Sequence, residues 1–466
     1  MAVGTGVQYA GEYTLDECKL LSSTGVVARL NDTVVEINLF ENMFANSLML
    51  SLVIVDKENL LMNMPVVGQE YVSLKITTKG IGSLDFTENV FSVHKISARQ
   101  DASAGSQIYE LSCVSTETLR NNRTRISKSY TGTQSDIFTT ILRDENLINT
   151  NKNIFIDETS RIKKYVVPNL RPLNFIKTLL RESTSKKYGG SPHYFFFENS
   201  RGFQFRVLDS LYKEPFQGEF VASEAAMLIK GENKRGDLER DYRRILNFTI
   251  SNSNDTLSSS RRGMLSSNTV KYNIFHKNYT KHTFNYFDNF KDFGRIDENP
   301  IYNEVPIDDF NNTVGDFPEG KIYVHPTSTT TDFIDAQHYD TSSQQYTYTS
   351  NKTQNTLQYR RSKYMELMGG VSLTLEVNGH TALEAGQMVD FFRDSTGKKI
   401  DDGIDKYFSG RFLISSLRHT FSNNFKKHEI TMLIVKDSFP SSIPVRSSAK
   451  PPRQRRGFTT NLTTRG

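Results

Sequence analysis

One stretch of alternating apolar and polar residues, 33–78, constrains the fold of this chain most. Val35, Ile37 and Leu39 alternate with polar neighbours, which is the period-2 pattern of a half-buried strand. A second apolar run, 48–55, is rich in strand formers and too short to span a membrane. A Gly-Gln turn and a third apolar run follow. The stretch therefore predicts an antiparallel β unit, and nothing in it is catalytic.

Residues 371–438 repeat this unit. A second Gly-Gln pair, Gly386-Gln387, matches Gly68-Gln69, which places Met388-Val389 on Glu70-Tyr71. Further along, the two copies run without a gap and keep the same inward alternation. Three residues of one copy fall on three of the other: Tyr109 on Ile430, Leu111 on Met432, and Cys113 on Ile434. The repeat predicts two similar barrels or sandwiches, and three chains would then place six similar walls around an axis.

Length and composition set the limits of the organisation. A chain of 466 residues predicts two to four domains, and 37% hydrophobic residues suffice for their cores. Cys18 and Cys113 are too few for a disulfide framework and are expected to be buried free thiols. The sequence contains no run of 18 apolar residues and no secretory signal pattern, so we expect no membrane insertion.

The part between the two copies has helical signals. Thr133 is a predicted N-cap with Asp136 at the third position of the helix. Pro172 suits the first turn of a second helix. A hairpin is expected at 194–208. These patterns predict a small α+β domain of about 100 residues. A further helix is expected at 222–229, after this domain.

The positive charge is concentrated in the last 26 residues, which contain six Lys or Arg and no acid. Because the whole chain has a net charge of +5, the remaining residues sum to −1. The body is therefore not a basic nucleic-acid-binding surface. The predicted partner-binding residues of this tail are Arg446, Lys450, Arg453, Arg455 and Arg456. Two interpretations of the tail remain open, contact with an acidic partner and a solvated, disordered end.

The sequence contains none of the common catalytic motifs. It has no phosphate-binding loop, no nucleophile elbow and no zinc-protease motif, and its nine His are scattered. Asp335 and His338 make a poor metal site, and 401–405 fits a hairpin turn better than a calcium loop. We therefore predict no catalytic, cofactor-binding or metal-binding residues and no enzyme activity. A carbohydrate-binding or hydrolytic tail protein is the alternative, because carboxylate pairs leave no mark in a sequence.

Three segments resemble one family in the same order along the chain. They comprise 42–70 in the first copy, 165–172 in the middle part, and 383–419 in the second copy. Together they resemble the baseplate central hub proteins of contractile-tailed bacteriophages and the related N-terminal part of the type VI secretion spike protein. The chain departs from that family in its long 281–355 region and its basic tail.

The resemblance implies an α+β, mostly β fold with two similar antiparallel tube-type β-barrels, a small α/β insert domain and a loop-rich excursion. The expected division is 1–117 first barrel, 118–215 small α+β domain, 216–280 with 356–440 second barrel, 281–355 excursion, and 441–466 basic extended tail.

The resemblance also implies a structural role in the virion. The expected protein is a homotrimeric hub in the tail baseplate, made in the host cytoplasm, that adapts a threefold spike to the sixfold tail tube. Its expected partners are the central spike protein, the tail tube or tube-initiator protein, the tape measure protein and the baseplate wedge proteins. DNA passes through it during genome ejection without sequence-specific binding.

Overall fold

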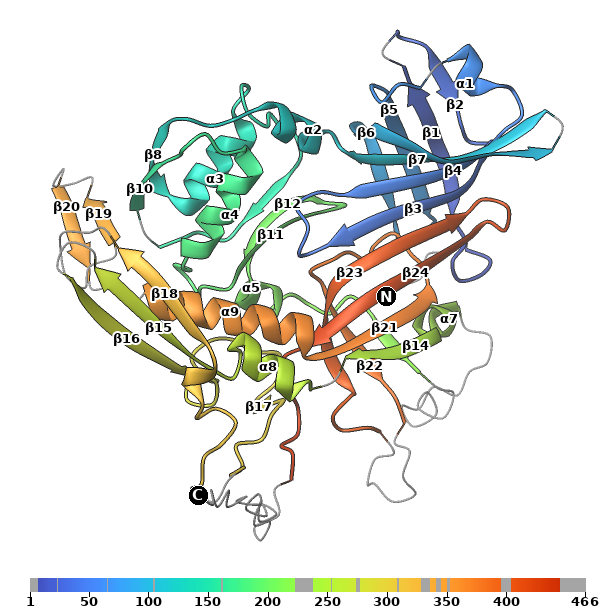
Figure 1. The fold of residues 1–466 in the computed structure, drawn as a ribbon. Coiled ribbons are helices and arrows are strands. Elements are labelled where there is room, and N and C mark those ends of the chain that lie inside the picture. The colour runs from blue at the N-terminus through green and yellow to red at the C-terminus, as the bar shows by residue number, and fades with distance from the viewer. Residues whose placement is uncertain are drawn as a thin grey trace, which may run out of the picture.

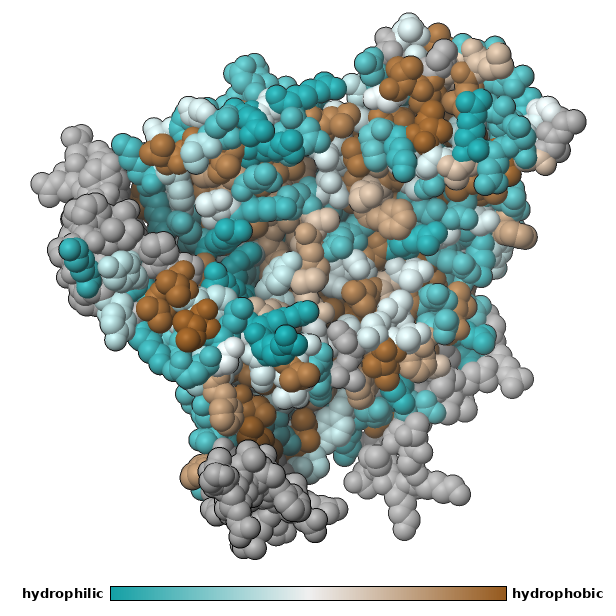
Figure 2. All heavy atoms as spheres, in the orientation of Figure 1, coloured by the Kyte–Doolittle hydropathy of each residue, from teal (hydrophilic) through white to brown (hydrophobic). Residues whose placement is uncertain are grey.

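The computed structural model describes residues 7–22, 24–64, 66–103, 105–160, 162–222, 238–252, 254–273, 277–307, 310–327, 336–340, 345–349, 353–394 and 404–444. Most of the regular structure is antiparallel β, and the longer helices lie beside the sheets (Figure 1). This confirms the predicted α+β, mostly β fold class. On the face shown in Figure 2, hydrophobic residues lie in separate groups among hydrophilic ones.

The first β unit is built from the N-terminal part of the chain. It comprises β1 (Thr14–Leu21), β2 (Val27–Arg29), β3 (Val34–Asn42), β4 (Met49–Asp56), α1 (Leu60–Asn63), β5 (Tyr71–Thr78), β6 (Gly82–Ser103) and β7 (Ser106–Ser115). The order β3-β4-β7-β6-β5-β1-β2 wraps these strands around one core. The hairpin of β6 and β7 is longer than expected, because the turn-rich connector between its arms is itself part of β6.

The core of this unit follows the predicted alternation with one exception. Ile37 and Leu39 are fully buried, but Val34 is buried in place of the predicted Val35. A register shift between Val34 and Glu36 causes the change, because a bulge moves the following side chains to the other face.

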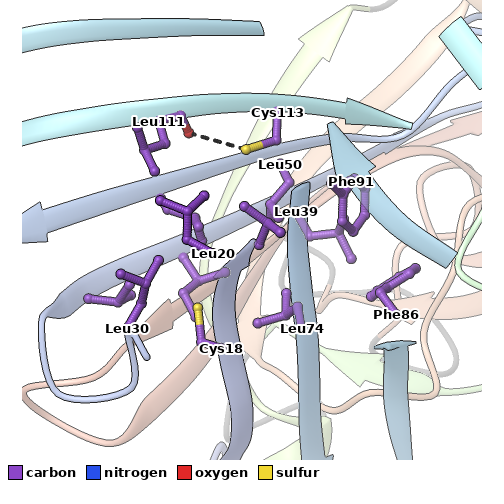
Figure 3. Packing of buried hydrophobic residues seen from close by; sticks show 14 of the residues in the cluster. Cys18, Leu20, Leu30, Leu39, Leu50, Leu74, Phe86, Phe91, Leu111 and Cys113 are labelled. Atoms are coloured by element: carbon purple, nitrogen blue, oxygen red, sulfur yellow. Dashed lines mark hydrogen bonds between the residues drawn. The ribbon is translucent and has the colours of Figure 1, made fainter. Parts of the chain in front are cut away.

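Both cysteines are buried free thiols in this core, as predicted. Figure 3 shows Cys18 and Cys113 among the leucines and phenylalanines of the unit. Burial raises the pKa of the Cys18 thiol to about 12, so this thiol stays protonated and unreactive.

The second β unit comprises β13 (Glu219–Val221), α7 (Leu238–Arg243), β14 (Ile245–Asn252), β21 (Val371–Asn378), β22 (Met388–Phe392), β23 (Gly410–Ser422) and β24 (Lys427–Lys436). Its strands surround a second core that includes Leu373, Leu375, Ile414 and Met432. The two units share one large sheet, because β23 pairs with β3.

The small α+β part has its own core, as its helical and hairpin signals indicated. Its elements are α2 (Thr116–Arg123), β8 (Ser129–Thr133), α3 (Gln134–Arg143), β9 (Ile154–Ile156), β10 (Ile162–Val166), α4 (Pro172–Glu182), β11 (Tyr194–Asn199), β12 (Gly202–Val207) and α5 (Leu208–Leu211). The hydroxyl of Thr133 accepts from the backbone N–H of Asp136, which confirms the predicted N-cap. Pro172 begins α4, also as predicted.

The range 281–355 contains more strands than its predicted loop-rich character allowed. The remaining described elements, some inside this range and some outside it, are α8 (Thr256–Arg262), β15 (Ser266–Asn273), β16 (Asn278–Asn285), β17 (Asn299–Pro300), the 3-10 turn η1 (Pro318–Gly320), β18 (Ile322–Thr327), β19 (Ala336–Asp340), β20 (Gln345–Thr349), α9 (Thr353–Gly369) and β25 (Ser438–Phe439). β16, β15 and β18 form a separate sheet, so in the described part of the chain β15 and β16 do not pair with the second β unit. The apolar residues of β18 are exposed, which is why no alternation marked the strand.

Several predictions fall wholly or partly on residues outside the described ranges. They are the helix at 222–229, Asp335 of the pair with His338, the hairpin turn at 401–405 and the basic tail beyond 444. α9 ends at Gly369, in a Gly-Gly pair that stops the helix.

Candidate assembly surface

The two β units have the same strand register, so the predicted repeat is confirmed. In each unit, three buried residues of one strand lie opposite three buried residues of the next. The equivalent pairs are Leu50–Cys113 and Leu373–Ile434, Leu52–Leu111 and Leu375–Met432, and Ile54–Tyr109 and Val377–Ile430. β4 and β7 thus correspond to β21 and β24 residue by residue.

Both units also interrupt the next strand pair at the same place. The register of β6 on β7 shifts between Val93 and Lys95, and that of β23 on β24 shifts between Ile414 and Ser416. Because a bulge bends its strand and increases the twist, both long strands change direction at equivalent residues.

The two Gly-Gln turns are also equivalent, with one difference in length. Gly68 and Gly386 have φ angles of 86° and 91°, a backbone conformation that favours glycine. The strands that follow pair as Tyr71–Ser92 and Met388–Leu413. Met388 therefore matches Tyr71 and not Glu70, so the alignment predicted at the turn was wrong by one residue. The first copy has an extra residue between its turn and its strand.

An intrachain seam, which we define as the pairing of β23 with β3, joins the two units. The pairs run from Ser416–Asn42 through Arg418–Phe40 and Thr420–Asn38 to Ser422–Glu36. The seam makes β14-β21-β24-β23-β3-β4-β7-β6 one continuous run of eight strands, which can be followed across Figure 1.

Polar side chains reinforce one face of the seam. The Arg418 Nε donates to the side-chain oxygen of Asn38 at 2.8 Å, and its Nη2 lies 3.3 Å from a Glu36 carboxylate oxygen. The Thr420 hydroxyl donates to the same Asn38 oxygen at 3.1 Å. The Arg418 guanidinium also lies over the Phe40 ring. These contacts fix the register of β23 on β3.

Aromatic rings fill the opposite face of the seam. Phe421 stacks on His428 with ring centroids 4.0 Å apart, and Tyr13 packs its edge against Phe421. The Nδ1 of His419 and the Nε2 of His428 form a hydrogen bond of 3.0 Å. Burial lowers the pKa of His419 to about 3 and that of nearby His380 to about 4. Both imidazoles are therefore neutral at pH 7.

The run of eight strands ends in two open edges. Among the residues that the structure describes, 95–101 of β6 pair only with β7, and β14 pairs only with β21. Ile250 on β14 is 40% exposed, whereas Leu39, which holds the equivalent position in the seam, is fully buried. Such an edge offers unpaired N–H and C=O groups to a further strand.

A buried ion cluster attaches the small α+β part to the first unit. The Lys152 ammonium lies 2.8 Å from a Glu117 carboxylate oxygen and 2.6 Å from one of Glu198. Glu198 also accepts from the Ser115 hydroxyl and the Leu48 backbone N–H. Burial acts to raise the pKa of Glu117, but Lys152 outweighs burial and holds that pKa below its ordinary value. Burial keeps the pKa of Glu198 raised.

A second buried cluster joins α9 to the end of β24. Lys363 pairs with Asp437, and Tyr212 donates its hydroxyl proton to the same carboxylate at 2.8 Å. Arg295 pairs with Glu366 at 2.7 Å. Burial acts to raise the pKa of Asp437, but Lys363 and Arg295 together hold it far below its ordinary value. These clusters are internal and are not aimed at a ligand.

A groove of about 700 Å³ lies between α4, α9 and β11. Phe44, Phe195 and Tyr364 supply apolar walls, and Lys177 and Arg181 are among its basic residues. Its lining brings no carboxylate pair together.

The structure places none of the predicted tail residues. Arg446, Lys450, Arg453, Arg455 and Arg456 all lie outside the described residues. Within the described part of the chain, no group of three or more His, Cys, Asp or Glu is arranged to hold a metal ion. No helix found there is long and apolar enough to cross a membrane.

The comparisons with known proteins point to one fold. No protein-family model matches the sequence, and no curated protein matches it. Two solved structures match over most of both chains. A tail protein from Neisseria meningitidis is 11% identical with a TM-score of 0.50, covering 91% of this chain and 97% of its own. A prophage tail protein from Shewanella oneidensis is 9% identical with a TM-score of 0.50, covering 91% and 99%. The chain therefore has the fold of these two tail proteins.

Proposed function

We propose that three copies of this chain form a hollow ring that serves as the central hub of a phage tail baseplate. The observation that supports the proposal best is the intrachain seam, which sets two matched β units side by side in one chain. Three chains joined in a similar way place six matched units around an axis. Such a ring suits a position between a threefold spike and a sixfold tail tube.

The size of the ring follows from the strand count. Eight strands per chain give twenty-four in a trimer. At a spacing of about 4.8 Å, they make a wall roughly 115 Å around and 37 Å across, and strand tilt widens it further. Such a lumen lets a tape measure protein and then the DNA duplex pass without sequence-specific binding.

The proposed partners act on different parts of the ring. The spike seats below it, the tail tube or tube-initiator protein sits above it, and the wedge proteins surround it. The basic tail, with Arg446, Lys450, Arg453, Arg455 and Arg456, binds an acidic surface on one of them. In this role the protein is a geometric adaptor within the virion and catalyses no reaction.

The mass and shape of the purified chain test the proposal. Native mass measurement is expected to give three times the mass of one chain, and negative-stain images a ring with a central hole. A monomer, or a chain that degrades polysaccharide, contradicts the hub. Removing 445–466 is expected to leave the ring intact. The truncation starts there because Phe439 is buried and Ile443 packs against the second core.

A further inference from the structure

We infer that neighbouring copies in the proposed ring join through an interchain seam, in which the β6 edge of one copy pairs with the β14 edge of the next. The register is that of the intrachain seam. The inference rests on the proposed ring, and it adds which strands meet and which residues lie opposite one another.

The two open edges hold the same places as the two strands of the intrachain seam. β6 takes the place of β23, because both pair with the equivalent strand, β7 or β24, through the same bulge. β14 takes the place of β3, because Phe248 and Ile250 face β21 as Ile37 and Leu39 face β4. Each unit therefore has one edge equivalent to β23 and one edge equivalent to β3. Within the chain β23 pairs with β3, and the other two edges, β6 and β14, stay open among the described residues.

Transferring the register gives a specific residue pair. Gln100 of β6 corresponds to Thr420 of β23, because the two residues pair with equivalent residues of β7 and β24. Thr249 of β14 corresponds to Asn38 of β3, because the two residues pair with equivalent residues of β21 and β4. Thr420 lies opposite Asn38 in the intrachain seam. Gln100 of one copy is thus expected opposite Thr249 of the neighbouring copy.

The exposure of apolar residues at the two edges agrees with this pairing. Leu39 and Leu417, within the intrachain seam, are 0% and 3% exposed. Their counterparts at the open edges are less covered, because Ile250 is 40% exposed and Ile96 is only half-buried. A strand added at either edge would bury this surface and satisfy the unpaired backbone groups.

Irregularities in both strands limit the part of the register that can be transferred. β6 has one residue more than β23 in the step that ends at Gln100, and Ala98 within that step has a φ of 51°. β14 shifts its register between Ile250 and Asn252, where β3 has no such shift. Gln100 and Thr249 both lie clear of these steps. β14 contains no charged residue, so no like charges oppose the pairing.

Disulfide trapping in the full chain tests the register. A Gln100→Cys/Thr249→Cys variant places two thiols directly opposite each other, within the Cα separation that a disulfide needs. Mild oxidation is expected to give covalent dimers and trimers on a non-reducing gel and no larger species, because the ring closes. The native thiols are buried and do not compete. The matched control is Ser97→Cys/Asn247→Cys, whose two thiols lie on the same two edges but four positions apart in this register.

Each outcome decides between the ring and the register. Covalent trimers from the first variant alone support the interchain seam. Trimers by native mass without cross-links, or with cross-links in the control, overturn the register and leave the ring standing. A cross-link confined to the monomer band overturns the seam as well. A chain that stays monomeric by native mass overturns the ring itself, and the seam with it.

Discussion

Arg418 on β23 and Asn38 on β3 are 380 residues apart in sequence, and the Arg418 Nε donates to the Asn38 side-chain oxygen at 2.8 Å. The bond lies on the intrachain seam, where the second unit meets the first. This contact aligns the two matched halves of the chain, and the proposed ring depends on that alignment.

Replacing Arg418 is expected to weaken the seam slightly. Arg418→Met keeps most of the apolar stem but removes the bonds to Asn38 and Glu36, and the side chain is 43% exposed. We expect the free energy of unfolding to fall by about 0.5–1 kcal/mol, because exposed charge-assisted contacts contribute little. Urea denaturation measures this change in the free energy of unfolding. The control is Arg411→Met, whose carboxylate partner is 4.0 Å away. Equal losses in both variants would show that the polar face of the seam adds no stability.

The buried histidines beside the seam are expected to make the protein less stable in acid. Burial holds the pKa of His419 near 3, below the value of about 6.5 in an unfolded chain. As the pH falls below 6.5, His419 binds a proton in the unfolded state but stays neutral in the folded state. The free energy of unfolding therefore falls, by about 1.4 kcal/mol per pH unit for this group.

A single variant isolates this effect. His419→Gln removes the titrating ring and keeps a hydrogen-bonding side chain next to His428. Between pH 6.5 and 4.5 its stability is expected to fall less steeply than that of the wild type, at constant protein concentration. The exposed His94→Gln is the control and is expected to leave the slope unchanged. An identical slope in all three proteins would exclude His419 as a source of the acid sensitivity.

Removing the buried ammonium of Lys152 is expected to be costly. Lys152→Met leaves Glu117 and Glu198 buried without their cation, and breaking such a cluster costs roughly 3–5 kcal/mol. Loss of the cation raises the folded-state pKa of both carboxyls above that in the unfolded chain. Carboxyls with a raised pKa favour the folded state only while they are protonated, so this stabilisation is lost as the pH rises. The loss of unfolding free energy in Lys152→Met is therefore larger at pH 8 than at pH 5.

The matched control lies on the surface of the same part of the chain. Lys186 pairs with Glu158 at 2.8 Å, and both side chains are mostly exposed. Lys186→Met is expected to leave the stability almost unchanged at either pH, because solvent screens an exposed ion pair. Denaturation curves at the two pH values measure both variants. A Lys152→Met deficit that is small, or that shrinks as the pH rises, would contradict the assigned role of the cluster.

The local patterns of the sequence predicted the elements better than their connections. Alternating residues marked the strands of both units, and the repeat could be aligned because Tyr109, Leu111 and Cys113 keep their phase with the second copy. The position of Met388 was missed, since an extra residue in a loop leaves no periodic signal. The seam was missed because any strand edge offers the same backbone groups, so alternation does not identify the partner strand.

The sequence also did not reveal the buried ion clusters or the separate sheet of β16, β15 and β18, for other reasons. Lys152 and its two carboxylates lie on separate elements, and charged residues in a sequence ordinarily indicate solvent exposure. β18 was missed because its apolar residues, Ile322 and Val324, are about half or more exposed in the described chain. A strand that buries few residues on either face lacks the pattern by which strands are found.

A charge at the open edge of β14 is expected to dissolve the ring without unfolding the chain. Ile250→Arg places an unpaired cation at a position whose counterpart, Leu39, is fully buried in the intrachain seam. Burying that cation costs several kcal/mol, so trimer dissociation should rise by a hundredfold or more, roughly, while the monomer keeps its unfolding transition because Ile250 is 40% exposed. Sedimentation and thermal unfolding measure the two effects separately. Leu257→Arg on α8, where the side chain is 72% exposed, is the control and should sediment as a trimer. A trimeric Ile250→Arg variant would show that β14 lies outside the contact between copies.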